Sequence, residues 1–284
     1  MTLYSKGQDT NDFQVKQTSK RLELLNQNKT PDRNDVCLVH VPYKLKVQVN
    51  TSEEASVHLS KLEAEEFVVK TQKGDINIAD LKADNIKVES SAGHIQAEGR
   101  LQASNIEMSS GLDGAIKCNS IMANSFHAST HTGPIFVKSC YSDNSHFITL
   151  MGNITLEHLH RSVKIEIIQK GNLHIQGFSG NLEATLKSGD VFMHASQLHN
   201  KSSIFIHEKG KVELLVHDIE KNLPKTNLIA DKIKVDDKIL KQGRFMDDSH
   251  PMRFRYEKDH KNELHIVCKN GSIDLKETDV PFLV

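Results

Sequence analysis

The chain has 284 residues, and its 36 Lys and Arg residues nearly cancel its 37 Asp and Glu residues. With no excess of positive charge, the composition does not favour a nucleic-acid partner or an anionic membrane surface. Trp is absent and aromatic residues make up only 5%, so a core must be aliphatic. No run approaches the roughly 18 to 20 apolar residues of a membrane span.

Residues 1–36 are polar and poor in aliphatic side chains, and we expect them to be largely disordered. They contain no apolar stretch of the secretory kind, and their acidic residues argue against a mitochondrial presequence. Four cysteines, at positions 37, 118, 140 and 268, have no regular spacing, which favours reduced, mostly buried thiols over a disulfide framework. These features predict an intracellular protein, cytoplasmic or in an organelle lumen such as the mitochondrial matrix, and not a secreted one.

Residues 37–54 contain the alternating segment CLVHVPYKLKVQVN, which predicts a strand. We expect this strand to cover the N-terminal end of a repeat array that follows it. A terminal repeat without such a cap offers an unpaired edge to other chains.

A repeat of about 19 residues runs from 55 to 215. Its glycines are separated by 19, 21, 19, 19, 19, 18 and 21 residues, and a last one follows after 61: Gly74, Gly93, Gly114, Gly133, Gly152, Gly171, Gly189, Gly210 and Gly271. The residues two and four positions after each glycine are small or aliphatic, and the one between them is mostly polar. This alternation is typical of a half-buried strand, and we expect each glycine to permit a turn with positive φ.

The second half of each repeat follows the pattern L-x-A-x-x-I-x-V and then Ser or Thr, as in LKADNIKVESSAG at 81–93. We expect Leu81 and Ala83 at a second corner, and Ile86 and Val88 on a second inward face. A unit this short has no room for a helix, and its strands bury their apolar faces only by stacking on equivalent strands about 4.8 Å away. The sequence therefore predicts an all-β, single-domain parallel β-helix (β-solenoid) of nine or ten coils of roughly 19 residues.

The rhythm breaks after residue 215, and residues 216–262 are expected to form irregular or elaborated coils. LIADKIKV at 228–235 still matches LKADNIKV at 81–88, so one coil persists there. The residues after it predict a modified coil or a protruding hairpin, of the kind that repeat arrays often use for binding. LHIVCKNGSIDL then begins the last coil and the C-terminal tail, over 263–284.

The units GDINI, GHIQA, GNITL, GNLHI, GDVFM and GSIDL, with L-x-A-x-x-I-x-V between them, resemble the adhesin-type family of β-solenoid domains of unknown function. The resemblance covers about residues 55–275 and is closest to the uncharacterised intracellular animal members of that family. It implies a parallel β-helical fold. Its motifs are structural glycines and aliphatic residues, so it implies no catalytic residues.

Histidines are the first candidate ligands, because the chain has 16 of them. His127 and His146 occupy equivalent positions in adjacent coils, and His158 and His160 form an H-x-H pair that a strand would point to one face. These residues raise the hypothesis of a zinc or copper site. No matching Cys, Asp or Glu constellation lies at the same level, so surface histidines are the favoured interpretation, with no metal and no cofactor.

Acidic residues give two weaker candidates. Asp75 and Asp190 directly follow repeat glycines but lie six coils apart, so they form no acid–base pair and are expected to bond turn amides. A second cluster offers oxygen ligands for Ca²⁺, although a solvated loop beside inward-facing Phe254 and Tyr256 is favoured; it comprises Asp236, Asp237, Asp247, Asp248 and His250.

The predicted function is a non-enzymatic solenoid that acts as a protein-interaction or scaffolding module, with no catalytic, cofactor-binding or metal residues. The alternative is a hydrolase or lyase that acts on a glycan or another polymer laid along one face. Acidic and basic side chains from adjacent coils that converge in one groove would favour the alternative. End-to-end self-association through an imperfect cap is a third, weaker hypothesis.

Overall fold

The structure of the chain is a computed structural model that describes residues 45–246, 250–257 and 261–279, together with the backbone of four short strands before residue 40. Two compact units make up the chain, Met1–Leu45 and Lys46–Val284.

The N-terminal unit contains two antiparallel strand pairs. β1 (Leu3–Lys6) pairs with β4 (Val36–Val39), and β2 (Phe13–Gln17) pairs with β3 (Leu22–Asn26). The sequence predicts disorder over most of this segment, but the alternating FQVKQ and LELLN are adequate for a local hairpin. The prediction of disorder is not tested for the other residues before Leu45, because they lie outside the described residues.

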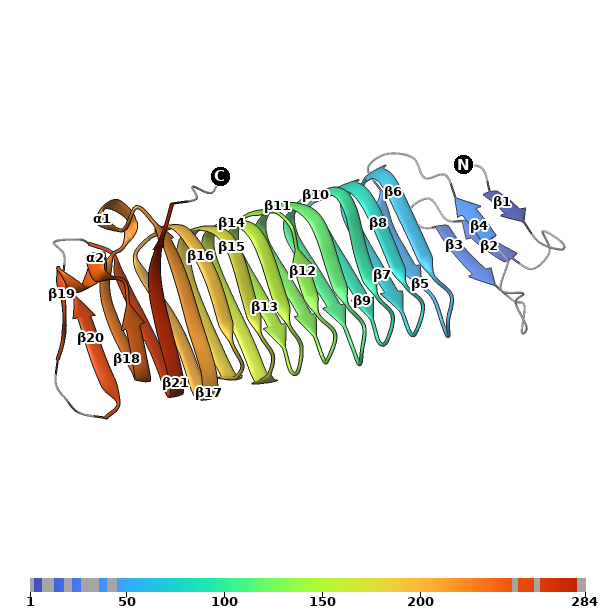
Figure 1. Cartoon of the computed structure of the whole chain (residues 1–284). Coiled ribbons are helices and arrows are strands. Elements are labelled where there is room, and N and C mark those ends of the chain that lie inside the picture. The colour runs from blue at the N-terminus through green and yellow to red at the C-terminus, as the bar shows by residue number, and fades with distance from the viewer. Residues whose placement is uncertain are drawn as a thin grey trace. The chain divides into compact units, whose positions relative to one another are not determined.

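The second unit is a stack of strands that Figure 1 shows side by side along one axis. Its first strand, β5 (Lys46–Asn50), pairs in parallel with β7, so the segment predicted as one capping strand over 37–54 is divided between β4 and β5. The following strands up to residue 217 are β6 (Val57–Glu63), β7 (Glu66–Thr71), β8 (Ile76–Lys82), β9 (Asn85–Ser90), β10 (Ile95–Ser110), β11 (Ile116–Thr130), β12 (Ile135–Val137), β13 (Cys140–Thr149), β14 (Ile154–Lys170), β15 (Leu173–Ser188), β16 (Val191–Leu198) and β17 (Lys201–His217).

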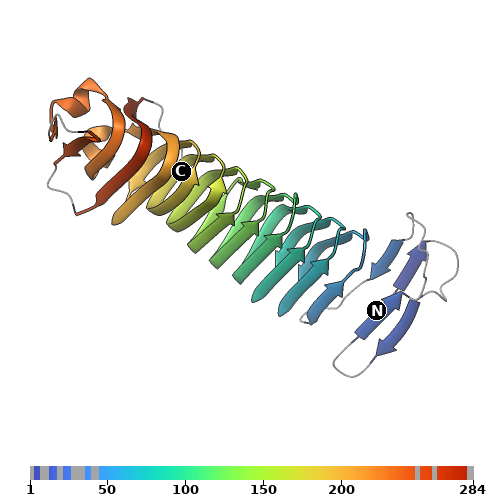
Figure 2. The ribbon, with the colours of Figure 1, turned by 90° about the horizontal axis from the view of Figure 1, so that it is seen from below.

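These strands form a parallel β-solenoid of about nine turns with about 20 residues per turn, as the sequence predicts. Each turn contributes one strand segment after its glycine and a second one before the next glycine. The two series build two parallel sheets, which Figure 2 shows from below as one continuous row of coils. β6 pairs with β8 in the first sheet, for example, while β7 pairs with β9 in the second.

The core is a set of aliphatic columns between the two sheets. Ile95 pairs in register with Ile76 on one side and Ile116 on the other, and the column continues through Ile135 and Ile154. Each of these side chains is at most 1% exposed, which confirms the predicted inward face. Burial of such columns is the main source of stability in a fold whose repeats contact only their neighbours.

The repeat glycines stack directly on one another at one corner of the coil. A Cβ on Gly133 would lie 2.1 Å from the carbonyl oxygen of Gly114, and the other repeat glycines from Gly93 to Gly271 show the same close approach to the preceding one. Only Gly189 among the nine has a positive φ in the left-handed range, 141°. The predicted reason for the glycines is therefore wrong for the other eight: the neighbouring backbone lies too close for a side chain.

Two ladders of polar side chains hold the same corner. Buried hydroxyls bond its carbonyl oxygens, as in Thr71 Oγ1 to Gly74 O at 2.7 Å and Ser110 Oγ to Gly93 O at 2.8 Å. Side chains directly after the glycine accept from the backbone of the next coil. Asp190 Oδ1, for example, accepts from the Lys211 amide at 2.8 Å. The recurring geometry of this corner thus depends on polar contacts between coils as well as on glycine.

The C-terminal coils are stacked in a different order from their order in the sequence. β21 (Glu263–Thr278) lies between β17 and β18 (Lys225–Val235) and pairs in parallel with both. β18 then pairs antiparallel with β20 (Met252–Tyr256), which pairs with β19 (Gly243–Phe245). Figure 1 shows β21 in dark red between its two neighbours. One short helix, α1 (Ile219–Asn222), precedes β18 in the chain, and a second, α2 (Asp237–Leu240), follows it.

This arrangement contains the predicted hairpin in residues 216–262 and the predicted coil at LIADKIKV. The sequence did not predict that the segment from 263 onward would return to Gly210 and that the LIADKIKV coil would lie beyond it. The glycine stack shows this return directly, since Gly271 lies on Gly210 although 61 residues separate them in the chain.

Candidate functional site

The candidate site is a groove along the corner opposite the glycines, where the first sheet turns into the second. We call it the corner groove. One section has a volume of about 590 Å³ and is lined by Lys82, Ala83, Asp84, Gln102, Ala103, Ser104, Met122, Ala123, Asn124, Tyr141, Asp143, His160 and Arg161. A second section of about 550 Å³ shares its Tyr141, Asp143, His160 and Arg161 and continues to Asn200.

The groove exists because the L-x-A segment of each repeat places a small residue at this corner. Ala83, Ala103 and Ala123 occupy equivalent positions in three successive coils and pack against the core. Longer residues stand on either side of each alanine. A row of methyl groups therefore forms the floor, and two rows of longer side chains form the walls.

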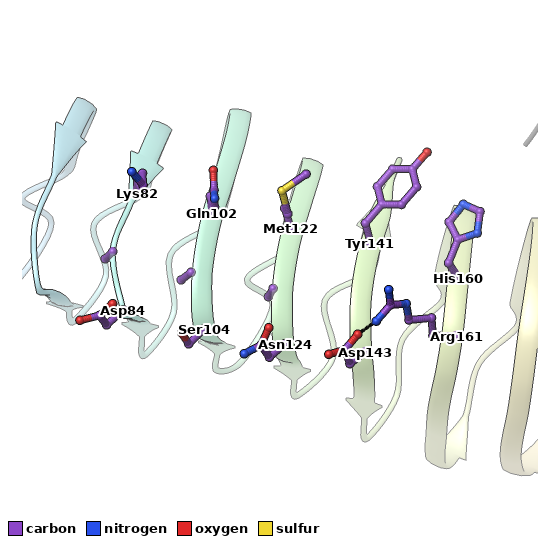
Figure 3. A pocket seen from close by; sticks show the side chains of 13 residues that line it. Lys82, Asp84, Gln102, Ser104, Met122, Asn124, Tyr141, Asp143, His160 and Arg161 are labelled. Carbon is purple, nitrogen blue, oxygen red and sulfur yellow. Dashed lines mark ion pairs between the residues drawn. The ribbon is translucent and has the colours of Figure 1, made fainter.

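The two walls differ in chemistry, as Figure 3 shows. One wall carries Lys82, Gln102, Met122, Tyr141 and His160, and the other carries Asp84, Ser104, Asn124 and Asp143. Adjacent members of the first wall pair in register across their strands, for example Gln102 with Met122 and Met122 with Tyr141. Each of the first four coils thus places one side chain on each wall, with a spacing of about 4.8 Å along the stack, and the fifth coil contributes His160 and Arg161.

Two pairs of residues contact each other at the centre of the groove. The rings of Tyr141 and His160 are nearly parallel, 14° apart, with 4.7 Å between their centroids. The guanidinium of Arg161 forms an ion pair with the Asp143 carboxylate from the preceding coil, drawn as a dashed line in Figure 3. Burial lowers the pKa of His160, with a smaller contribution from the charge of His158. A neutral, stacked imidazole beside an exposed ion pair is therefore the state of this centre near neutral pH.

Arg161 has an unusual backbone. Its φ is 68°, in the left-handed range that non-glycine residues rarely adopt, and the residue paired with it in the next coil is Gly180. The strand register also shifts here, because the 140–144 corner has one residue more than the 159–162 corner. The shortened corner therefore turns at Arg161.

Backbone groups of the groove are already bonded within the stack. The Asp84 amide donates to Glu65 O at 3.0 Å, the Ser104 amide to Asp84 O at 3.0 Å, and the Ala83 amide to Gln102 O at 3.0 Å. A ligand in the groove would therefore be bound by side chains and not by addition of a strand.

The predicted histidine stack is confirmed. The rings of His127 and His146 lie edge to face with 5.1 Å between centroids, on the outer face of the second sheet. His146 Nε2 lies 3.0 Å from Glu166 Oε1, which also pairs with Lys164 at 2.9 Å. No group of three His, Cys, Asp or Glu side chains that could hold a metal ion occurs in the described part of the chain.

The H-x-H pair lies where the strand is irregular, because His158 has a φ of 47°. Leu159 between the two histidines is buried while both histidines are partly exposed, which agrees with the predicted outward placement of the pair. His160 lies in the corner groove against Tyr141. After burial, the charge of His158 is the second contribution to the lowered pKa of His160.

The acidic candidates have structural roles. Asp75 Oδ1 accepts from the His94 amide at 2.8 Å, and Asp190 makes the same bond to Lys211, so both bond turn amides as predicted, in the next coil and not in their own. Asp236 caps α2 by accepting from the Lys238 amide at 3.2 Å, and the side chains of Phe254 and Tyr256 are buried as predicted. His250 lies 3.4 Å from Asp231, while Asp247 and Asp248 are outside the described residues.

Sequence reasoning missed the residues of the corner groove, above all Met122, Tyr141, Asp143 and Arg161. One signal was present, since the recurring alanine of L-x-A predicts a shallow floor at this corner. The convergence of Asp143 and Arg161 had no such signal, because it depends on the register shift between their coils.

The fold and the groove define a β-solenoid repeat protein with a side-chain-lined groove along its axis. The model of the Toastrack DUF4097 family matches residues 4–112 and 100–276, and the chain belongs to this family. The match confirms the β-solenoid resemblance and assigns no activity. No solved structure was found that matches the chain.

Among the described residues there is no helix long and apolar enough to cross a membrane.

Proposed function

We propose that this chain is a non-enzymatic interaction module whose corner groove binds an extended segment of a partner protein. The observation that carries the proposal is the groove itself, which places equivalent side chains at regular intervals along successive coils. A surface of this kind presents many weak contacts in one line, as repeat proteins do when they bind extended partners.

Exposed apolar side chains support binding at the groove. Met122 is 40% exposed and Tyr141 is 49% exposed, and the two are paired neighbours on one wall. Tyr is enriched in protein interfaces, and Met adapts its shape to different partners. Their neighbours Gln102 and Asn124 supply polar groups around them, which is the usual composition of an interface with an apolar centre and a polar rim.

The alternative, a glycan- or polymer-acting enzyme, has one observation in its favour. Asp143 and Arg161 bring an acidic and a basic side chain from adjacent coils together in the groove. Hydrolysis of a glycosidic bond uses two carboxyl groups roughly 5 to 9.5 Å apart. Asp84, the other carboxylate of the groove walls, is three coils from Asp143, or about 14 Å along the stack. We therefore propose binding and not turnover.

The test is affinity capture from cells with the full chain carrying Met122→Ser and Tyr141→Ser. We expect this variant to lose partners that the wild type captures reproducibly. The matched control is Leu112→Ser with Met151→Ser, which removes two exposed apolar side chains that do not line the groove. Equal capture by both variants, or turnover of a polysaccharide panel by the wild type, would contradict the proposal.

The compartment is also a proposal. The predicted reduced thiols favour the cytoplasm or the mitochondrial matrix, in keeping with the resemblance to intracellular animal proteins of this fold. Proximity labelling in cells reports the compartment and the neighbouring proteins in one experiment. Labelling of extracellular proteins alone would contradict an intracellular location.

A further inference from the structure

The centre of the corner groove combines strain, exposure and charge at one residue. Arg161 has a left-handed backbone that favours glycine, and its side chain is 68% exposed. Backbone strain of this kind persists where the surroundings enforce it and is common at binding sites. A glycine would turn the same corner without strain. Because an arginine stands there instead, its exposed side chain is a candidate for contact with a ligand.

The ion pair of Arg161 leaves the guanidinium available. Asp143 is 46% exposed, and an ion pair between two such exposed groups adds little to stability. A guanidinium has five donors, and its planar fork matches a carboxylate with two parallel hydrogen bonds. A second carboxylate, from a ligand in the groove, fits the donors that Asp143 does not use.

The walls indicate the kind of polymer that carries this carboxylate. They contain two cationic and two anionic side chains, Lys82 and Arg161 against Asp84 and Asp143. They also contain apolar Met122 beside Tyr141, between the charged positions. Arg161 pairs with Asp143, and Lys82 pairs with Glu63 at 3.3 Å, but these pairs are exposed and each leaves charged groups open to a ligand. A polypeptide presents charged and apolar side chains along one chain, whereas a neutral glycan offers no charged group to these walls.

The length of the first section of the groove gives the size of the segment. From Lys82 to His160 there are four steps between coils, or about 19 Å, which about six residues of extended chain span.

We propose, on the basis of the function proposed above, that the corner groove binds an extended polypeptide segment of about six residues. A carboxylate of this segment pairs with Arg161, and an apolar side chain lies against Met122 and Tyr141. Arg161 is thus the residue that determines the charge preference of the groove.

The first test is a selection of random eight-residue peptides displayed on phage against the immobilised full chain. Three proteins are compared: the wild type, Arg161→Glu and Lys187→Glu. Lys187 is the matched control, because it carries the same charge, is about half exposed and pairs with Glu208 at 3.5 Å outside the groove. We expect the wild type and Lys187→Glu to enrich peptides with Asp or Glu, and Arg161→Glu to enrich Lys or Arg at the same peptide position.

The second test separates binding from folding. Arg161→Gly removes the guanidinium and also the strain of the left-handed backbone. We expect its melting temperature to be unchanged or higher, while its affinity for a peptide selected on the wild type falls about tenfold or more, because a charge-assisted bidentate bond is lost. A peptide that binds Arg161→Gly as tightly as the wild type would overturn the role of Arg161.

Other outcomes overturn the proposal in distinct ways. No enrichment on the wild type, or the same acidic consensus on Arg161→Glu, contradicts the polypeptide ligand and the charge preference. Binding of neutral oligosaccharides that requires Tyr141 but not Arg161 would assign the groove to a glycan. If the peptide tests fail while capture of cellular partners still depends on Met122 and Tyr141, the interaction function stands and only this inference fails.

Discussion

A Cβ placed on Gly271 would lie 1.8 Å from the carbonyl oxygen of Gly210, a residue 61 positions earlier in the chain. The same approach occurs at every step of the glycine stack, so each of these positions excludes a side chain by contact with the neighbouring coil. The excluding atom is backbone, which moves only if the coil separation changes.

Substitution of an interior repeat glycine should therefore be strongly destabilising. We expect Gly133→Ala to lower the free energy of unfolding by about 3 kcal/mol, since its Cβ would lie 2.1 Å from Gly114 O. Gly74→Ala is the comparison, because its contact is with Ala55 O in the first coil, which has fewer neighbours to resist a shift. Chemical denaturation measures both variants, and an equal or larger loss at Gly74 would contradict this explanation.

Removal of residues 263–284 should unfold more than those residues. β18 would lose β21, its parallel partner, and the hairpin of β19 and β20 would be left on an isolated strand. We expect amide hydrogens of residues 225–256 to exchange at unprotected rates in this truncated chain, while those of β7 to β15 stay protected. A chain that ends at residue 217 is the control. Protected amides in 225–256 of the chain that ends at residue 262 would show that the expectation is wrong.

The described cysteines should be unreactive in the folded protein. Burial raises the pKa of Cys140 and of Cys268 to about 11 each, and it also raises the pKa of Cys118. Because the thiolate is the reactive form, a thiol reagent at pH 8 should modify none of these three before unfolding and all of them in denaturant. Rapid modification of Cys118 in the native protein, located by mass spectrometry, would contradict the buried core.

Mild acid should destabilise the fold through its histidines. Burial lowers the pKa of His127, helped by the charge of His146, and burial also lowers the pKa of His194. A histidine whose pKa is lower in the folded state binds more protons when unfolded, so its stabilising contribution is present above pH 6.5 and is lost as the pH falls below that value. We expect the melting temperature to decrease from pH 7.5 to 5.5 and to decrease less in His127→Gln, and a pH-independent melting temperature would refute this.

Much of the fold could be predicted because the repeat places glycine and aliphatic residues at fixed intervals. Ile76, Ile95 and Ile135 lie above one another as their spacing predicts. The gap before Gly271 was ambiguous, since an insertion in one coil and a return to an earlier coil leave the same distance in the sequence. The groove was harder still, because Tyr141 and Arg161 occupy positions where other coils carry different residues. Their convergence depends on the corner geometry of two neighbouring coils, which no local pattern records.

The position of β21 also bears on synthesis. A ribosome releases the coils up to residue 217 in the order in which they stack, so each new coil has a finished surface to join. Residues 225–256 emerge before 263–278 and yet lie beyond them, so they cannot reach their final place when they leave the exit tunnel. We infer that this end of the molecule stays detached from the stack until about twenty later residues arrive, and that vectorial assembly stops at β17 until then.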